Sequence, residues 1–172
     1  GITQTREPLQ IGAELYGHSG LESDLEIQQL MLQCLSVVGI NQIHLDLGHV
    51  GVFRGLIKRG GISTELETEL IAVLQAKDIA SLKELSSKLK KTTREALLLL
   101  PELYGDKKVL VLAAEFLPYC PEVNKALDEF AAIERDCNIS LDKVAFDLSD
   151  LRGYHYHTGI VFAAYTYGSS NA

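Results

Sequence analysis

The length, composition and charge of the chain indicate one folded domain and exclude several classes of protein. The chain has 172 residues, of which 47% are hydrophobic, enough for one well-formed core. Its net charge of −7 gives no overall basic surface for nucleic acid, and no apolar run is long enough to span a bilayer. Three widely separated cysteines predict neither a zinc site nor a disulfide framework, so we expect a reduced, cytoplasmic setting.

The first predicted element is a strand over residues 8–17, where side chains of two kinds alternate. One face would carry Leu9, Ile11, Ala13 and Leu15, and the other would carry Gln10, Gly12, Glu14 and Tyr16. This period of two indicates a half-buried strand with one polar face. Gly12 would let a ligand lie against the backbone between Gln10 and Glu14, and an ordinary solvent-facing strand fits the same pattern.

A helix and a second strand are predicted next. The helix opens at Glu22 or Ser23 and ends at Gly39, and its apolar positions have helical spacing. These positions are Ile27, Leu30, Met31, Cys34, Leu35 and Val38. We expect this face to lie on a sheet, with Cys34 in the core.

In the second strand, residues 42–47, His44 and Asp46 share the face opposite Ile43, Leu45 and Leu47. No third catalytic partner accompanies His44 and Asp46. We therefore interpret both as residues of the surface or of the rim of a site.

Residues 49–104 change character and are predicted to be helical, without a convincing strand. Gly60 and Gly61 separate two helices, and Ser63 (or Thr64) and Asp78 can cap the helices that follow. A further helix begins at Thr92 or Thr93. Three roles stay open for this block: contact with a partner subunit, cover for a pocket, and simple packing.

The rest of the chain completes an α+β pattern. Residues 108–116 are apolar, and Ala113, Ala114 and Glu115 favour a helix over a strand. Pro121 can be the first residue of a helix that runs to Asp136. Strands are predicted at residues 144–148 and 158–166. This order of elements predicts a mostly antiparallel sheet with a helical insertion.

The segment from Asp150 to Phe162 combines groups that suit a small, flat, charged ligand. The guanidinium of Arg152 is a fork of donors that matches a carboxylate or phosphate. Alternating tyrosine and histidine rings from Tyr154 to His157 offer stacking faces and polar tips. An ordinary edge strand rich in tyrosine and histidine is the alternative.

Two motifs in order along the chain resemble the histidyl-tRNA synthetase family. Residues 10–17, QIGAELYG, are similar to the strand after the motif 2 loop, and residues 152–162 are similar to the histidine-specific arginine motif. The resemblance covers most of the chain and implies a class II aminoacyl-tRNA synthetase-like fold, of which this chain would be a truncated, central fragment. We expect a partial sheet core in residues 1–48 and 142–172, and a mainly helical insertion in residues 49–141.

Details of these motifs resemble the regulatory subunit of short-form ATP phosphoribosyltransferase, a synthetase-like paralogue without aminoacylation activity. Residues 47–56, LGHVGVFRGL, are similar to a segment typical of that subunit. His155 and His157 stand where the synthetase has an aspartate and a tyrosine, and Ala163 stands where it usually has a glutamate. The resemblance implies a non-catalytic subunit that acts in the first step of histidine biosynthesis. The catalytic core of a histidyl-tRNA synthetase and a helical interaction domain without a ligand are the alternatives.

The resemblance also implies roles in histidine binding for five residues. Gln10 would hold the amino or carboxylate end, Glu14 would accept a hydrogen bond from the imidazole, and Arg152 would face the carboxylate. Tyr156 and His157 would line the ring pocket. No catalytic residue, metal or cofactor is expected. The implied partners are the short-form catalytic subunit, further copies of this chain in a homodimer or higher hetero-oligomer, and histidine, with no membrane and no nucleic acid.

Overall fold

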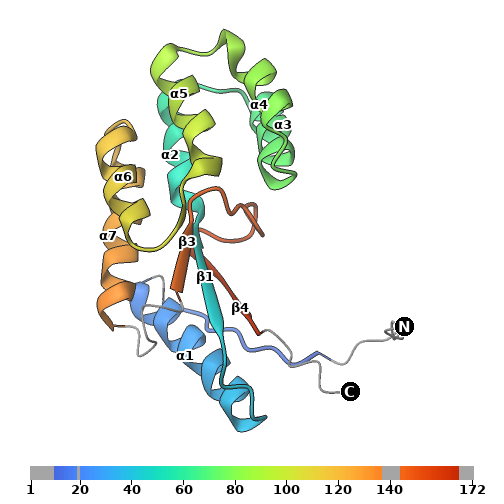
Figure 1. Ribbon diagram of the computed structural model, residues 1–172, viewed down its shortest axis with the longest axis vertical. Helices are drawn as coiled ribbons and strands as arrows, with labels where there is room; N and C mark the ends of the chain where they lie inside the picture. Colours follow the sequence, from blue (N-terminus) through green and yellow to red (C-terminus); the bar gives the residue numbers. More distant parts are fainter. Residues whose placement is uncertain (1–9, 19, 137–143, 167–172) are drawn as a thin grey trace.

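A computed structural model describes residues 10–18, 20–136 and 144–166 of the chain (Figure 1). The helices are α1 (Leu21–Val37), α2 (Val50–Gly60), α3 (Thr64–Gln75), α4 (Ile79–Leu85), α5 (Lys91–Leu99), α6 (Lys108–Phe116) and α7 (Pro121–Asp136). The strands are β1 (His44–His49), β2 (Tyr104–Gly105), β3 (Val144–Asp147) and β4 (Ile160–Tyr165), and two short 3-10 turns are η1 (Ser86–Lys88) and η2 (Leu100–Glu102). No helix in these ranges is long and apolar enough to cross a membrane.

The strands form one mixed sheet in the order β2-β3-β1-β4. β1 runs antiparallel to β4 and parallel to β3, and β2 runs antiparallel to β3. The predicted mostly antiparallel sheet is confirmed, with one parallel pair at its centre. A parallel pair needs a long crossover connection, and the helices from α2 to α7 provide it between β1 and β3.

The two faces of the sheet differ in character because side chains alternate along each strand. Leu45, Leu47 and Phe146 are fully or almost fully buried, and Phe146 packs edge-on against Phe130 of α7, with 5.4 Å between ring centroids. Asp46 lies on the opposite face, where its register neighbours are Ala145 and Ala163. The strand begins at His44 and not at residue 42, and it continues to His49; within it the predicted apolar face of Leu45 and Leu47 and the opposite face of Asp46 are confirmed.

The helical block forms as local chemistry predicts, except that Tyr104 at its end begins the short strand β2. The Ser63 side chain accepts a hydrogen bond from the Leu66 N–H and caps α3, and the Asp78 side chain caps α4 through the Ser81 N–H. Gly61 ends α2 in the left-handed conformation, with a φ of 62°. In Figure 1, α3, α4 and α5 lie beyond one end of the sheet, and α1 lies toward the other.

The strand predicted at residues 8–17 is not formed over its described part. Residues 10–17 are exposed and have no regular structure, and the side chain of Ile11 is 95% exposed. A strand needs a neighbour to pair its backbone N–H and C=O groups, and in the described sheet no strand lies beside this segment. Residues 8 and 9 lie outside the described residues.

Helix α1 forms, but the face that it buries agrees only in part with the predicted one. Leu21, Leu25 and Met31 pack against the core and Gln28 is buried, whereas Leu30 is 41% exposed. The prediction of Cys34 as a core residue is wrong, because its side chain is exposed. Leu21, Leu25 and Gln28 follow an i, i+4, i+7 spacing, so the contact face is rotated from the apolar stripe of the sequence.

Candidate ligand-binding site

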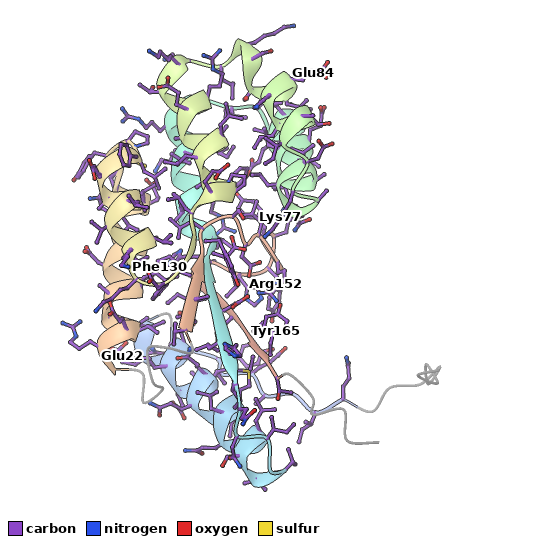
Figure 2. The ribbon with its side chains drawn as sticks, viewed as in Figure 1. Glu22, Lys77, Glu84, Phe130, Arg152 and Tyr165 are labelled. Carbon is purple, nitrogen blue, oxygen red and sulfur yellow. The ribbon has the colours of Figure 1, made fainter. Side chains whose placement is uncertain are left out.

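A cavity of about 530 Å³ lies on the polar face of the sheet. Its lining comes from all four strands or their ends, from the end of α3, and from the loop after β3. The lining residues are Asp46, Leu74, Gln75, Lys77, Tyr104, Asp147, Ser149, Asp150, Leu151, Arg152 and Tyr165. Figure 2 shows Lys77, Arg152 and Tyr165 along the same side of the sheet. The volume suits a small molecule.

The floor of the cavity contains a carboxylate between two small side chains. Asp46 is partly buried, and Ala145 and Ala163 flank it on the neighbouring strands. These methyl groups leave space above the sheet that larger side chains would fill. Burial raises the pKa of Asp46, the Asp147 carboxylate raises it further, and Arg152 opposes both effects.

Asp150 and Tyr165 hold the side chain of Arg152 in place. Its Nε lies 2.9 Å from each carboxylate oxygen of Asp150, and its Nη2 also donates to that carboxylate. Its Nη1 donates to the Tyr165 hydroxyl at 3.2 Å. The hydrogen bonds to Asp150 raise the pKa of Arg152, so the guanidinium stays charged. An anionic ligand at Arg152 would therefore share the guanidinium with Asp150.

Lys77 connects the turn after α3 to the sheet. Its Nζ lies 3.7 Å from Oδ2 of Asp147 and 5.5 Å from the ring centroid of Tyr104. Asp147 also accepts hydrogen bonds from the backbone N–H and the hydroxyl of Ser149, at 2.9 and 2.6 Å. Lys77 has a φ of 52°, the left-handed conformation that glycine adopts more readily. The turn thus places an ammonium group at the edge of the cavity.

Helices α2 and α3 hold the loop that follows β3. Nη2 of Arg54 donates to the carbonyl oxygens of Tyr154 and His157, at 2.7 and 2.9 Å. The guanidinium also lies 4.8 Å from the ring centroid of Tyr154, whose hydroxyl donates to Glu67. Gln75 Nε2 donates to the carbonyl of Leu151 at 3.0 Å. Of the roles left open for the helical block, packing is observed, and Leu74, Gln75 and Lys77 line one side of the cavity.

Only one of the five predicted histidine-binding residues lines the cavity, and it is Arg152. Tyr156 and His157 are exposed on the loop, with 5.2 Å between their ring centroids. Gln10 and Glu14 are exposed on the segment 10–18, which contributes no residue to the cavity lining.

Tyr16 connects Glu14 to the loop. Its hydroxyl donates to Glu14, and contacts with Glu14 and Tyr156 raise the pKa of Tyr16. Glu14, Tyr16 and Tyr156 thus belong to a part of the molecule that does not line the cavity.

Several cavity residues carried no usable signal in the sequence. Asp46, which was predicted to lie at the surface or at the rim of a site, lies on the floor of the cavity, and alternation along β1 indicated its face. Lys77, Tyr104 and Asp147 were missed, because their approach depends on strand register and on a turn far away in the sequence. Within the described ranges, no group of three or more His, Cys, Asp or Glu side chains could hold a metal ion.

A second polar cluster joins the end of β1 to α7. The buried His49 accepts a hydrogen bond from the Gly51 N–H at Nδ1 (2.9 Å), and its Nε2 lies 2.6 Å from Oε2 of Glu129. Because Nδ1 accepts, the proton of the neutral ring is on Nε2 and is donated to Glu129. Burial lowers the pKa of His49, and Glu129 opposes that effect. Burial raises the pKa of the nearby Asp24.

Comparisons with known proteins identify relatives of the whole chain. A family model described as histidyl-tRNA synthetase matches residues 1–172. An ATP phosphoribosyltransferase regulatory subunit of Nitrosospira multiformis is 62% identical over 176 residues, covering 100% of this chain and 45% of the relative. A protein of the same name from Nitrosomonas eutropha is 61% identical over 172 residues, covering 98% and 44%. The chain thus spans slightly less than half the length of these relatives.

Solved structures show the same fold at lower identity. The structure of an ATP phosphoribosyltransferase regulatory subunit/histidyl-tRNA synthetase from Bacillus halodurans C superposes with a TM-score of 0.74 at 23% identity, covering 87% of this chain and 40% of that one. An ATP phosphoribosyl transferase (HisG:HisZ) complex from Thermotoga maritima gives a TM-score of 0.60 at 17% identity, covering 85% and 52%. At these identities the likeness establishes the fold.

Proposed function

The chain belongs to the histidyl-tRNA synthetase family, and from this premise we propose that it is part of a non-catalytic regulatory subunit of ATP phosphoribosyltransferase. The observation that carries the proposal is the 61–62% identity to two proteins of that name. The substitutions in the arginine motif agree with it, because His155 and His157 replace residues that the synthetase uses. The subunit would act in the first step of histidine biosynthesis.

We propose histidine as the ligand, with its carboxylate facing Arg152. The cavity beside Arg152 supports this choice, because it combines a cationic fork with carboxylates and tyrosine hydroxyls in about 530 Å³. Gln10, Glu14, Tyr156 and His157 complete the proposed site. The Tyr16 hydroxyl donates to Glu14 and its pKa is raised in part by Tyr156, which supports a common approach of Glu14 and Tyr156 to the ligand.

Simple energetics agree with the role of a sensor. Each hydrogen bond to a charged group contributes roughly 1.5–3 kcal/mol. Three such contacts, after the entropy of immobilisation is subtracted, give affinities from about micromolar to millimolar. A feedback regulator of an amino-acid pathway needs this range. To transmit inhibition, histidine must also favour one of two assembly states of the complex.

Calorimetry on the full-length protein tests the ligand. We expect Glu14→Gln and Arg152→Ala each to weaken histidine binding by about tenfold or more, because each removes a hydrogen bond to a charged group. Glu69→Gln and Arg94→Ala are matched controls, since both residues lie outside the cavity. Unchanged affinity in both site variants would refute the site.

We propose two kinds of protein partner: the short-form ATP phosphoribosyltransferase catalytic subunit, and further copies of this chain. One solved structure with this fold is an ATP phosphoribosyl transferase (HisG:HisZ) complex, which supports the first. A pull-down with the catalytic subunit tests the interaction. Histidine-dependent ATP–pyrophosphate exchange by the full-length protein would instead favour the alternative, a histidyl-tRNA synthetase.

A further inference from the structure

The cavity beside Arg152 contains a carboxylate outside the proposed set of histidine-binding residues. Asp46 lies on the cavity floor, between Ala145 and Ala163. The other two acids of the cavity already have partners, since Asp150 holds Arg152 and Asp147 accepts from Ser149 and lies near Lys77. Among the described residues, no side chain forms a hydrogen bond or an ion pair with the Asp46 carboxylate.

The balance of charge in the cavity leaves one carboxylate in excess. Three aspartates face two cations, Lys77 and Arg152, and each cation is nearest to an aspartate other than Asp46. Asp46 is partly buried, and neither cation forms a hydrogen bond or ion pair with it in the described residues, so the hydration that it loses is only partly replaced. Burial is also the first cause of the raised pKa of Asp46, and the Asp147 carboxylate raises this pKa further, whereas Arg152 and His44 lower it. A cationic group of a ligand would relieve this imbalance.

We propose that Asp46 binds the ammonium group of an α-amino acid whose carboxylate faces Arg152. The inference rests on the proposed function, which supplies an amino acid as the ligand. Asp46 and Arg152 have opposite charges, line the same cavity, and lie close enough for the charge of Arg152 to act on Asp46. A zwitterion presents both of its charges on neighbouring atoms, and a cavity with one cation and one anion matches that arrangement.

Recognition at both ends has a consequence for selectivity. Histamine retains the ammonium and imidazole of histidine but lacks the carboxylate, and 3-(imidazol-4-yl)propionate retains the carboxylate but lacks the ammonium. Each analogue leaves one charged group of the cavity without its ligand partner, which costs binding free energy. Wild-type protein should therefore bind histidine more tightly than either analogue.

The test is calorimetry of the full-length protein with these three ligands. In Asp46→Asn, which preserves the shape of the side chain, histidine and histamine should each bind about tenfold more weakly. Binding of 3-(imidazol-4-yl)propionate should change by less than about twofold, because this ligand has no ammonium for Asp46. Asp128→Asn removes the same charge from the exposed surface of α7 and should leave all three affinities unchanged.

Each outcome separates the two proposals. If wild-type protein binds histidine and Asp46→Asn binds it equally well, Asp46 is not the ammonium site and the proposed function stands. If wild-type protein binds 3-(imidazol-4-yl)propionate as tightly as histidine, the ammonium group is not recognised. This comparison uses wild-type protein alone, so it holds even if Asp46→Asn does not fold. If wild-type protein binds no histidine, the proposed function fails and the assignment of Asp46 fails with it.

Discussion

Two regions of the molecule differ sharply in how they are packed. The packed region consists of α2 to α7 with β1 and β3, and side chains such as Phe53, Leu97 and Phe130 are fully buried in it. The exposed region consists of residues 10–18 and the outer face of α1, where Ile11 is 95% and Val37 is 87% exposed. Figure 1 shows the exposed region at one end of the molecule. Because apolar burial supplies most of the stabilisation of a fold, the two regions contribute very unequally to stability.

The difference matters for the proposed site, because the site draws on both regions. Asp46 and Lys77 belong to the packed region, and Arg152 lies in the loop that α2 and α3 hold. Gln10 and Glu14 belong to the exposed region. One half of the site is therefore fixed by the core, whereas the other half depends on a segment with few contacts.

The largest effect is expected for a cavity-forming change in the packed region. Phe130→Ala removes a ring that packs edge-on against His49 and Phe146, at centroid distances of 5.7 and 5.4 Å. We expect the free energy of unfolding, measured by urea denaturation, to fall by about 3–5 kcal/mol. A loss below about 1 kcal/mol would show that this region is not the source of stability.

A smaller effect is expected for the link between α2 and the loop. Arg54→Met keeps the apolar stem but removes the donors to the carbonyls of Tyr154 and His157. Hydrogen bonds of this kind contribute about 1.5–3 kcal/mol, so hydrogen exchange in residues 154–157 should become faster.

Arg59→Met is the matched control for this change. Arg59 lies on the same helix, but it donates to the Tyr119 carbonyl and not to the loop. Equal exchange in residues 154–157 of the two variants would contradict the anchoring role of Arg54.

Much of the packed region could be predicted from the sequence, because its signals are local. Alternation identified the faces of β1, and proline at position 121 marked the start of α7. Capping chemistry placed Ser63 and Asp78 at helix starts, and both caps are observed. These signals depend on residues within one or two turns of each other.

The exposed region and the cavity could not be predicted in this way. Alternation in residues 10–17 shows that a strand could pair, but it does not show whether a partner strand lies beside it. The cavity depends on the register of three strands, which places Ala145 and Ala163 beside Asp46. It also depends on Lys77, whose left-handed turn brings a distant residue to Asp147.

The pH dependence of stability tests the cluster that joins β1 to α7 in the packed region. Burial lowers the pKa of His49 below its ordinary value of 6.5. Because the folded-state pKa is lowered, His49 contributes stability that is fully present above pH 6.5. This contribution is lost as the pH falls from 6.5 through the folded-state pKa. The free energy of unfolding should therefore decrease between about pH 7.5 and about pH 5.5.

A His49→Gln variant should show a weaker decrease over the same range, because its side chain does not titrate. The raised pKa of Asp24 acts in the opposite direction, since its contribution is lost as the pH rises above its ordinary value of 3.8. An equal decrease in wild type and His49→Gln would assign the pH dependence to other groups.

The smallest effect is expected at the surface of α1. It tests whether the contrast between the packed and the exposed region also holds in the full-length protein. Val37→Ser changes a side chain that is 87% exposed and alters helix propensity little, so it isolates burial. If the contacts of this chain are the only ones that α1 makes, the free energy of unfolding of the full-length protein should change by less than about 0.5 kcal/mol. A loss above about 2 kcal/mol would mean that another part of the longer protein, or a second copy, covers α1. In that case the contrast between the two regions would describe the contacts within this chain and not the stability of the whole protein.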